Sequence, residues 1–305
     1  MAVEYLGRVS MSQTPGSAEL QSLIADRLRE HAGPGREVGW LVDAVIDARP
    51  LEMVVLSADI RLSTLLMKEA VDIQLFAQGV SAFMDDCQQA TFSHGGFFDK
   101  FTGDGFLAYW IPEELNPVTE DADGVEPEWL AYLDSQLRGE AQQTDDAEAF
   151  SERYRDVASS YEKNVLEALS VSLSAAAELL VNFSEVTLPM FRSQSRNLSS
   201  GVGLSIGIDV GEVQLMPVAR QFTILGPPVV GAVRMVSAAQ PWETLANVYP
   251  GELLNRFPQE VDHDVGVSLE YRKTKEYSRQ EVYRIAFNRL SLPGSEAASV
   301  EHWTG

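Results

Sequence analysis

The first sixty residues change from a helical to a strand-like spacing of hydrophobic positions. Apolar residues recur at helical spacing over 18–31, and a second short helix is expected over 38–48, ending before Pro50. The run 51–59 is then almost continuously apolar, which is typical of a buried strand. These patterns predict an N-terminal helical segment over residues 1–50, followed by the start of the main domain.

A β-hairpin is expected next. A helical pattern over 64–90 is followed by segment 94–112, which holds two β-rich runs. The turn residues Gly103, Asp104 and Gly105 separate these runs. The pattern therefore predicts a hairpin with an aspartate at its tip.

The second half of the main domain repeats helix and strand patterns. A long helical region over 152–191 precedes apolar alternation over 201–218, which predicts a pair of strands that breaks at Val210 and Gly211. A helix is expected over 229–240, because Pro241 stops it. The last two strands are expected over 266–273 and 281–287.

The order of these elements indicates the fold class. It contains β-α-β-β-α-β, which predicts an α+β fold with a ferredoxin-like core and extra strands. The main domain then spans 51–290, and the tail over 291–305 is expected to be flexible.

Segment 113–150 is strongly acidic. It holds twelve acidic residues against a single basic one, Arg138, so about half of the chain's net charge lies in it. Such a charge run is usually a solvated loop. We interpret it as an acidic insertion in the main domain.

The overall charge limits the partners. In 305 residues, 23 Lys and Arg stand against 45 Asp and Glu, a net charge of -22 at pH 7. This charge repels a phosphate backbone, so nucleic acid is not an expected partner. An anionic small ligand remains possible, because a few local cations or metal ions invert the field at one site.

Targeting signals and soft metal ligands are scarce. No run of eighteen apolar residues occurs and the N-terminus does not have the pattern of a signal peptide, so we expect a cytoplasmic protein without a membrane anchor. Cys87 is the single cysteine and the four histidines are scattered, which excludes a zinc motif. Oxygen ligands would hold any metal, which favours magnesium, manganese or calcium.

Two aspartates are candidates for such a metal site. Asp59 ends a buried strand and Asp104 lies at the tip of the hairpin expected beside that strand. An aspartate in a T-G-D-G turn is ordinary when it stands alone. Two carboxylates that converge repel each other unless cations lie between them, so the pair suggests a two-metal phosphoryl-transfer site.

Four segments together carry a family resemblance. They are S-A-D-I-R at 57–61, K-F-T-G-D-G at 100–105, G-I-D-V-G-E-V at 207–213 and F-T-I-L-G-P-P-V-V-G-A-V-R-M at 222–235. In this order they resemble the successive motifs of the class III nucleotidyl cyclase catalytic domain, over about 51–287. The acidic insertion departs from the family in length, at a connection that tolerates one.

The resemblance implies a set of metal ligands and a homodimer. Asp59, Asp104 and the carbonyl of Ile60 would hold two divalent cations per site, Mn²⁺ or Mg²⁺. The ribose 3′-hydroxyl of a nucleoside triphosphate would then attack the α-phosphorus in line and release pyrophosphate. In the family, the metal aspartates of one chain meet the arginine helix of the other, so two equivalent sites are implied.

The resemblance also implies residues that bind the phosphates. Arg234 matches the family arginine that faces the developing negative charge. Lys275, in K-T-K-E-Y, matches a late phosphate-binding lysine, and Lys273 is close enough to take that role instead. The alternative for Arg234 is an ordinary arginine on the helix surface.

Lys100 and Thr223 match the pair that selects the base. A lysine only donates, whereas a hydroxyl donates or accepts, so the pair suits adenine N1 with its amino group or uracil O4 with N3–H. Two departures lie on the nucleoside side. Val230 replaces the usual helix asparagine, and the usual D-I-x-G-F-T run has Leu62 in place of its glycine.

The compact, membrane-free chain and its D-I-R-x-S-T run at 59–64 resemble the pyrimidine cyclases of the bacterial Pycsar antiphage systems. Those enzymes make cyclic UMP or cyclic CMP, which activates a separate effector. UTP is therefore the favoured substrate, with CTP and ATP as alternatives.

Two other classes of function remain open. A catalytically inactive homodimeric scaffold could keep this fold, although both aspartates, the lysine and Arg234 are present. A diguanylate cyclase or polymerase palm shares the core topology, but the hairpin reads T-G-D-G-F and the acidic surface opposes a template.

Overall fold

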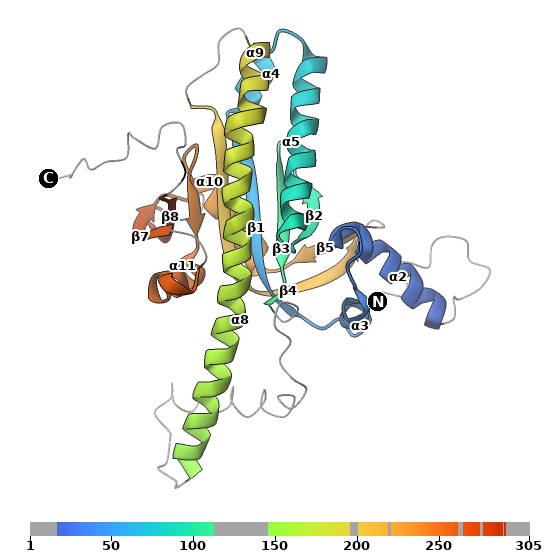
Figure 1. Ribbon diagram of the computed structural model, residues 1–305, viewed down its shortest axis with the longest axis vertical. Helices are drawn as coiled ribbons and strands as arrows, with labels where there is room; N and C mark the ends of the chain where they lie inside the picture. Colours follow the sequence, from blue (N-terminus) through green and yellow to red (C-terminus); the bar gives the residue numbers. More distant parts are fainter. Residues whose placement is uncertain are drawn as a thin grey trace, which may run out of the picture.

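An eight-stranded mixed sheet forms the centre of the described chain (Figure 1). The computed structural model describes residues 17–112, 146–195, 201–218, 221–261, 265–274, 277–288 and 290. The strands are β1 (Leu51–Arg61), β2 (Phe97–Phe101), β3 (Gly105–Trp110), β4 (Gly203–Val218), β5 (Gln221–Leu225), β6 (Thr244–Ala246), β7 (Val265–Arg272) and β8 (Gln280–Phe287). Their order in the sheet is β2-β3-β1-β4-β6-β8-β7, and β5 pairs with β4.

The topology confirms the α+β fold expected from the sequence. β1 lies in the middle of the sheet and runs antiparallel to both β3 and β4. Helix α5 (Ile73–Ser93) connects β1 to the β2–β3 hairpin, and helix α8 (Asp146–Asn182) connects that hairpin to β4. These elements make the β-α-β-β-α-β core, to which the structure adds β5 to β8.

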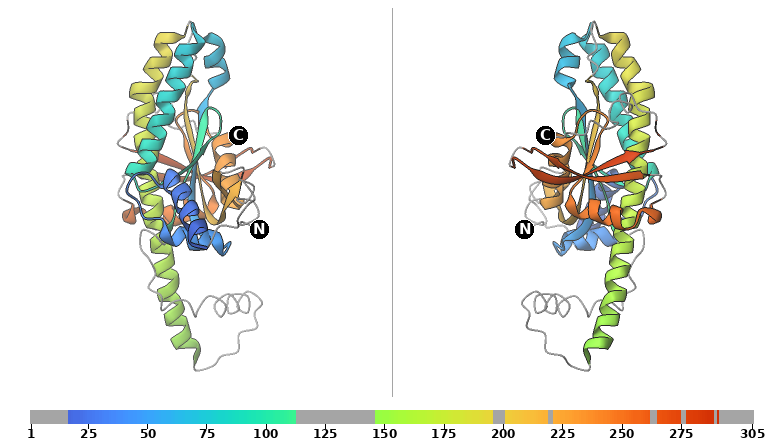
Figure 2. Two further views of the ribbon diagram at one scale, coloured as in Figure 1. Left: turned by 90° about the vertical axis from the view of Figure 1, so that its right-hand side faces the viewer. Right: turned by 90° about the vertical axis from the view of Figure 1, so that its left-hand side faces the viewer.

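Helices cover both faces of the sheet (Figure 2). On one face lie α5, α8, α9 (Leu188–Gln194) and α11 (Val248–Arg256). On the other lie α10 (Pro227–Ala238), α2 (Ser17–Ala32) and α3 (Gly39–Ile46). The period of two along β1 explains the two cores, because Leu56 and Ala58 pack into the first and Met53 and Val55 into the second.

The long helix α8 is a core element over much of its length. A π-helical turn at Phe183–Thr187 joins it to α9. Segment Tyr161–Gln194 is long and apolar enough to cross a membrane by length and composition, but 67% of its apolar window is buried inside the protein. Val165, Leu169 and Leu173 pack against the sheet, as expected for the central helix of a globular domain.

Two expected elements differ in detail. The helical pattern over 64–90 forms two helices, the short α4 (Ser63–Glu69) and then α5, whose first turn is capped by Asp72 accepting from the backbone N–H of Gln74. The expected strand pair over 201–218 is one continuous strand, β4. Gly211 has a positive φ of 152°, and β4 pairs with β1 from Gly203 to Val213 and with β5 from Gln214 to Val218.

Several expectations concern residues outside the described part of the chain. They are the acidic insertion up to residue 145, the tail over 291–305 and Lys275. Residues 146–150 belong to helix α8.

Candidate active site

The structure brings Asp59 and Asp104 together at one corner of the sheet. Asp59 pairs across the strands with Gly105, and Asp104 directly precedes that glycine. The backbone N–H of Ile60 donates to the carbonyl oxygen of Asp104 at 3.3 Å. Gly105 allows this close approach, because a Cβ there would lie 2.2 Å from the carbonyl oxygen of Ala58.

Both carboxylates line one open cavity of about 520 Å³. The cavity is lined by Asp59, Ile60, Arg61, Leu62, Ser63, Thr64, Leu65, Lys68 and Asp104. The pKa of Asp59 is raised to about 6. Burial is the largest cause, and the negative charge of Asp104 and a hydrogen bond between the two carboxyl groups also raise the pKa, whereas the positive charge of Arg61 lowers it. The pair is therefore electrostatically strained, and a cation between the carboxylates would relieve it.

The donor set fits hard divalent cations. Among the residues that the structure describes, no group of three or more His, Cys, Asp and Glu side chains could hold a metal ion. A cation at Asp59 and Asp104 would thus complete its shell with the backbone carbonyl of Ile60, with water and with phosphate oxygens. Mg²⁺ usually binds in this way, through one or two carboxylates plus substrate phosphates.

Leu62 follows this site in an unusual backbone conformation. Its φ is 62° and its ψ 25°, the left-handed region, and it is the N-cap of α4. This conformation costs a branched apolar residue about 1–2 kcal/mol of conformational free energy, whereas glycine adopts it without steric strain. The position is the one at which the family run D-I-x-G-F-T has its glycine.

Lys68 is a cavity residue that the sequence analysis missed. It lies on α4 and lines the cavity with the two carboxylates. The signal was present, since Lys68 is the only lysine or arginine between Arg61 and Lys100. Its exposed ammonium group gives the acidic cavity a cation for an anionic ligand.

Helix α10 presents Arg234 close to Asp209 of β4. The helix lies directly on the strand, because a Cβ at Gly207 would be 2.2 Å from the carbonyl oxygen of Ala232. Asp209 is 6% exposed and accepts hydrogen bonds from Asn247 Nδ2 and from the backbone N–H that follows it, both at 2.9 Å. Burial raises the pKa of Asp209 to about 6, although these hydrogen bonds and the positive charge of Arg234 act to lower it.

Arg234 does not line the cavity that holds the two carboxylates. Asp209, whose pKa the charge of Arg234 lowers, pairs with Val55, which precedes Asp59 by four residues on β1. Four residues of strand span roughly 13 Å. Within one chain, the cavity therefore holds the two carboxylates without the arginine.

Lys100 and Thr223, the expected base-selecting pair, meet across β2 and β5. The Lys100 ammonium donates to Thr223 Oγ1 at 2.5 Å. Asp99, which the sequence analysis missed, organises both of them. Its buried carboxylate accepts from Thr223 Oγ1 and from the backbone N–H of Ile224, each at 3.0 Å, and lies 3.2 Å from the Lys100 ammonium.

Asp99 decides which way the Thr223 hydroxyl points. A carboxylate only accepts, so the hydroxyl hydrogen is directed at Asp99. Toward a ligand, Thr223 then offers a lone pair and Lys100 offers N–H. From the sequence alone the Thr223 hydroxyl could donate or accept, and the buried carboxylate of Asp99 removes that choice.

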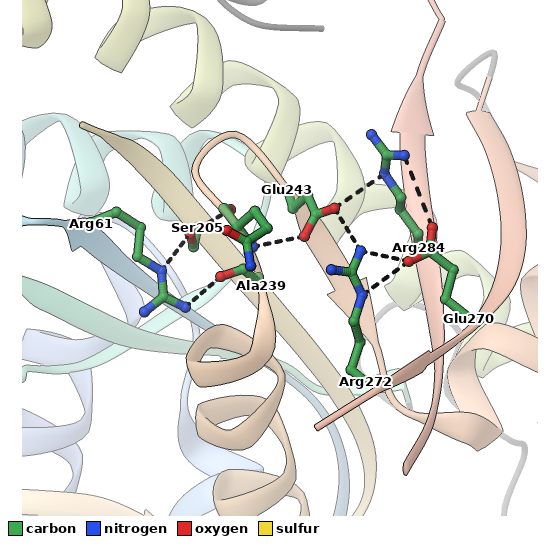
Figure 3. Close-up of polar contacts among 8 residues, drawn as sticks. Arg61, Ser205, Ala239, Glu243, Glu270, Arg272 and Arg284 are labelled. Atoms are coloured by element: carbon green, nitrogen blue, oxygen red, sulfur yellow. Dashed lines mark hydrogen bonds and ion pairs between the residues drawn. The ribbon is translucent and has the colours of Figure 1, made fainter. Parts of the chain in front are cut away.

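Arg61 connects the strand of the carboxylates to the end of helix α10 (Figure 3). Its guanidinium donates to Ser205 Oγ at 2.9 Å, to the carbonyl oxygen of Ala239 at 2.7 Å and to that of Val236. Further polar contacts continue from there through Glu243 to β7 and β8.

Solved structures with the same architecture identify the fold. No family model matches the sequence, and no curated protein matches it. The described architecture is similar to the crystal structure of the adenylyl cyclase CyaB from P. aeruginosa, with a TM-score of 0.52 and 16% identity over 80% of this chain and 98% of that one. The chain has the fold of a class III nucleotidyl cyclase domain.

Two guanylyl cyclase structures are also similar. The guanylyl cyclase Cya2 has a TM-score of 0.49 and 15% identity, over 81% of this chain and 98% of that one. The guanylate cyclase domain of RhGC from Catenaria anguillulae has a TM-score of 0.46 and 12% identity, over 78% of this chain and 97% of that one.

The remaining expected residues belong to helix α10 and to the segment that follows β7. Val230 lies on α10 one turn before Arg234 and is 49% exposed. Because its side chain is apolar, it offers no hydrogen bond at this surface. Lys273 follows the end of β7 and is exposed. Lys275, two residues on, lies outside the described residues.

Proposed function

We propose that this chain is the catalytic unit of a homodimeric nucleotidyl cyclase that converts UTP to 3′,5′-cyclic UMP and pyrophosphate. The observation that carries the proposal is the convergence of Asp59 and Asp104 in one cavity of a cyclase fold, where a divalent cation between the carboxylates would relieve their mutual repulsion. In the reaction the ribose 3′-oxygen bonds to the α-phosphorus, the bond from that phosphorus to the β-phosphate oxygen breaks, and the hydroxyl proton passes to solvent.

One group of residues holds the metal ions and another stabilises the phosphates. Asp59, Asp104 and the Ile60 carbonyl hold two divalent cations, which when bound neutralise the triphosphate and acidify the 3′-hydroxyl. Arg234 and a lysine of the β7–β8 turn, Lys275 or Lys273, stabilise the charge that develops on the phosphates. Because these are positioning and electrostatic effects, each residue must be held in place by the fold.

A second copy of the chain completes the site. Arg234 does not line the cavity of Asp59 and Asp104 in its own chain, so the carboxylates of one subunit need the α10 helix of the other. Exposed apolar side chains on the α10 surface and the nearby strands support such an interface; they are Val218, Leu225, Val230 and Val233. A head-to-tail dimer has two such sites.

Base recognition uses the Lys100–Thr223 pair. Lys100 donates to uracil O4, and N3–H of the base donates to the Thr223 lone pair that Asp99 leaves available. CTP and ATP, the alternative substrates, also present an acceptor beside a donor, and guanine O6 with N1–H has the same pattern as uracil. The preference for UTP is supported by Val230, which replaces the family asparagine on the nucleoside side.

Product analysis tests this proposal. The purified protein is incubated separately with ATP, GTP, CTP and UTP, with Mn²⁺ or Mg²⁺, and the products are identified by mass spectrometry. Cyclic UMP as the main product is the expected result, lost in Asp59→Asn and Asp104→Asn and retained in the surface control Asp26→Asn. Cyclic AMP or cyclic CMP as the main product would refute UTP as the substrate but not the cyclase activity. No product with any nucleotide would favour a catalytically inactive scaffold.

The product would act outside this chain. We propose that the enzyme is cytoplasmic and that cyclic UMP activates a separate effector in antiviral defence, as in the pyrimidine cyclases that the sequence resembles. Neither nucleic acid nor a membrane is needed for this role.

A further inference from the structure

Arg61 lies two residues beyond Asp59 on β1, and its guanidinium is engaged by helix α10. The nitrogen Nε donates to Ser205 Oγ at 2.9 Å, and Nη2 donates to the carbonyl oxygens of Ala239, at 2.7 Å, and of Val236. These bonds span 144 to 178 residues of sequence. A residue at the edge of the carboxylate cavity therefore holds an element that carries a different catalytic group.

The two carbonyls belong to the C-terminal end of α10. The last carbonyls of a helix have no partner within the helix, and a cation there is favoured by both hydrogen bonding and the helix dipole. Val236 lies two residues after Arg234, so Arg61 fixes the turn from which Arg234 projects.

The contacts continue from this cap to the C-terminal hairpin (Figure 3). Ser205 Oγ donates to the carbonyl oxygen of Gln240 at 2.8 Å, and the backbone N–H of Gln240 donates to Glu243 Oε2 at 2.7 Å. Glu243 Oε1 pairs with Arg272 Nη2 at 2.8 Å and with Arg284 Nε at 3.5 Å. Arg272 ends β7 and directly precedes Lys273, so the network reaches the strand that leads into the expected phosphate-binding turn.

We propose that Arg61 is a positioning residue that holds α10, and with it Arg234, in the orientation the reaction needs. This inference rests on the proposed function, because it assumes that Arg234 acts on the substrate. In the dimer, the α10 helix of a chain serves the carboxylates of the other chain. Arg61 therefore stands beside the metal ligands of one site and supports catalysis in the other.

The competing explanation is local. Arg61 also lines the carboxylate cavity, so its loss could disturb the metal ligands of its own chain. Single-variant homodimers do not separate the two explanations, since each homodimer carries the change on both sides. A heterodimer with only one complete site separates them.

The experiment combines two inactive chains, Asp59→Asn and Arg234→Ala, in one heterodimer purified through two different tags. Its one complete site takes its carboxylates from the Arg234→Ala chain and its α10 helix from the Asp59→Asn chain. Arg61→Met is then added to either chain. If Arg61 acts through α10, the change lowers kcat roughly 10- to 100-fold in the Asp59→Asn chain and leaves kcat unchanged in the Arg234→Ala chain.

The opposite pattern, or equal losses on both sides, would overturn the proposal. Ser205→Ala, a smaller change in the same network, should show the same dependence on the chain that carries it, and it covers the case in which Arg61→Met does not fold. Arg256→Met, which removes an exposed ion pair with Glu162, is the matched control and should change nothing in either chain. An unmodified heterodimer without activity would instead refute the composite site of the proposed function.

Discussion

The buried carboxylate of Asp99 accepts the hydroxyl hydrogen of Thr223 at 3.0 Å, across 124 residues of sequence. This hydrogen bond turns a side chain that could donate or accept into one that only accepts from a ligand. Thr223 is the residue that matches the base-selecting position of the family. Asp99 determines whether the Thr223 hydroxyl donates a hydrogen bond to a ligand or accepts one.

We predict that Asp99→Asn weakens base discrimination. An asparagine amide can accept or donate, so the Thr223 hydroxyl regains both orientations and Lys100 loses its ion pair. The ratio of kcat/KM for the preferred nucleotide over the others should fall about tenfold, which corresponds to the loss of one good hydrogen bond. Competition between nucleotides, read by mass spectrometry, measures it. An unchanged ratio in a folded variant would show that Asp99 only stabilises β2 and β5.

Removing one carboxylate of the cavity should abolish activity and stabilise the metal-free protein. Asp59→Asn ends the repulsion that contributes to the raised pKa of Asp59, and it leaves the strand pairing with Gly105 in place. We expect a gain of about 1 kcal/mol in the free energy of unfolding without divalent ions. Mn²⁺ should raise Tm in the parent protein but much less in the variant. Equal Mn²⁺ shifts in both would place the cations elsewhere.

Leu62→Gly should stabilise the fold. The side chain is 46% exposed and its φ of 62° favours glycine, so the substitution relieves strain and removes little buried area. A gain of about 1 kcal/mol is expected in chemical denaturation. Leu65→Gly, three residues later within α4, is the matched control and should cost about 1 kcal/mol. Destabilisation by both changes would mean that the Leu62 side chain makes contacts worth more than its backbone strain.

Asp209 should make stability depend on pH in a defined direction. Its folded pKa of about 6 lies above the value of 3.8 expected for an unfolded chain. The protonated form is therefore favoured by folding, so its contribution is present in full below pH 3.8 and is lost as the pH rises through 6. Relative to Asp209→Asn, which does not titrate, the parent protein should lose about 2 kcal/mol between pH 4.5 and 7.5. Denaturation at both pH values measures this difference, and parallel behaviour of the two proteins would contradict it.

Local patterns were sufficient to predict the main architecture and the convergence of the two carboxylates. A strand that ends in Asp59 and a hairpin with Asp104 at its tip can be read from a few consecutive residues, because strand periodicity and turn chemistry depend on near neighbours. The predicted bounds of strands were less accurate where pairing with a strand far away in the sequence defines the element. β6 has three residues, too few to show a pattern, and β4 continues through Gly211 because its pairing with β1 extends past that glycine to Val213, after which it pairs with β5.

The sequence by itself determined which residue types are available: two carboxylates on adjacent elements, a lysine and a threonine for a base, and an arginine inside a helix. The tertiary structure decided how they act. Asp99 and Arg61 form their decisive bonds to residues more than 120 positions away, and no periodicity links such positions. The tertiary structure also shows that Arg234 does not line the cavity of Asp59 and Asp104 within one chain. Hydrogen-bond direction and the distance between elements depend on packing in three dimensions, which no local sequence pattern encodes.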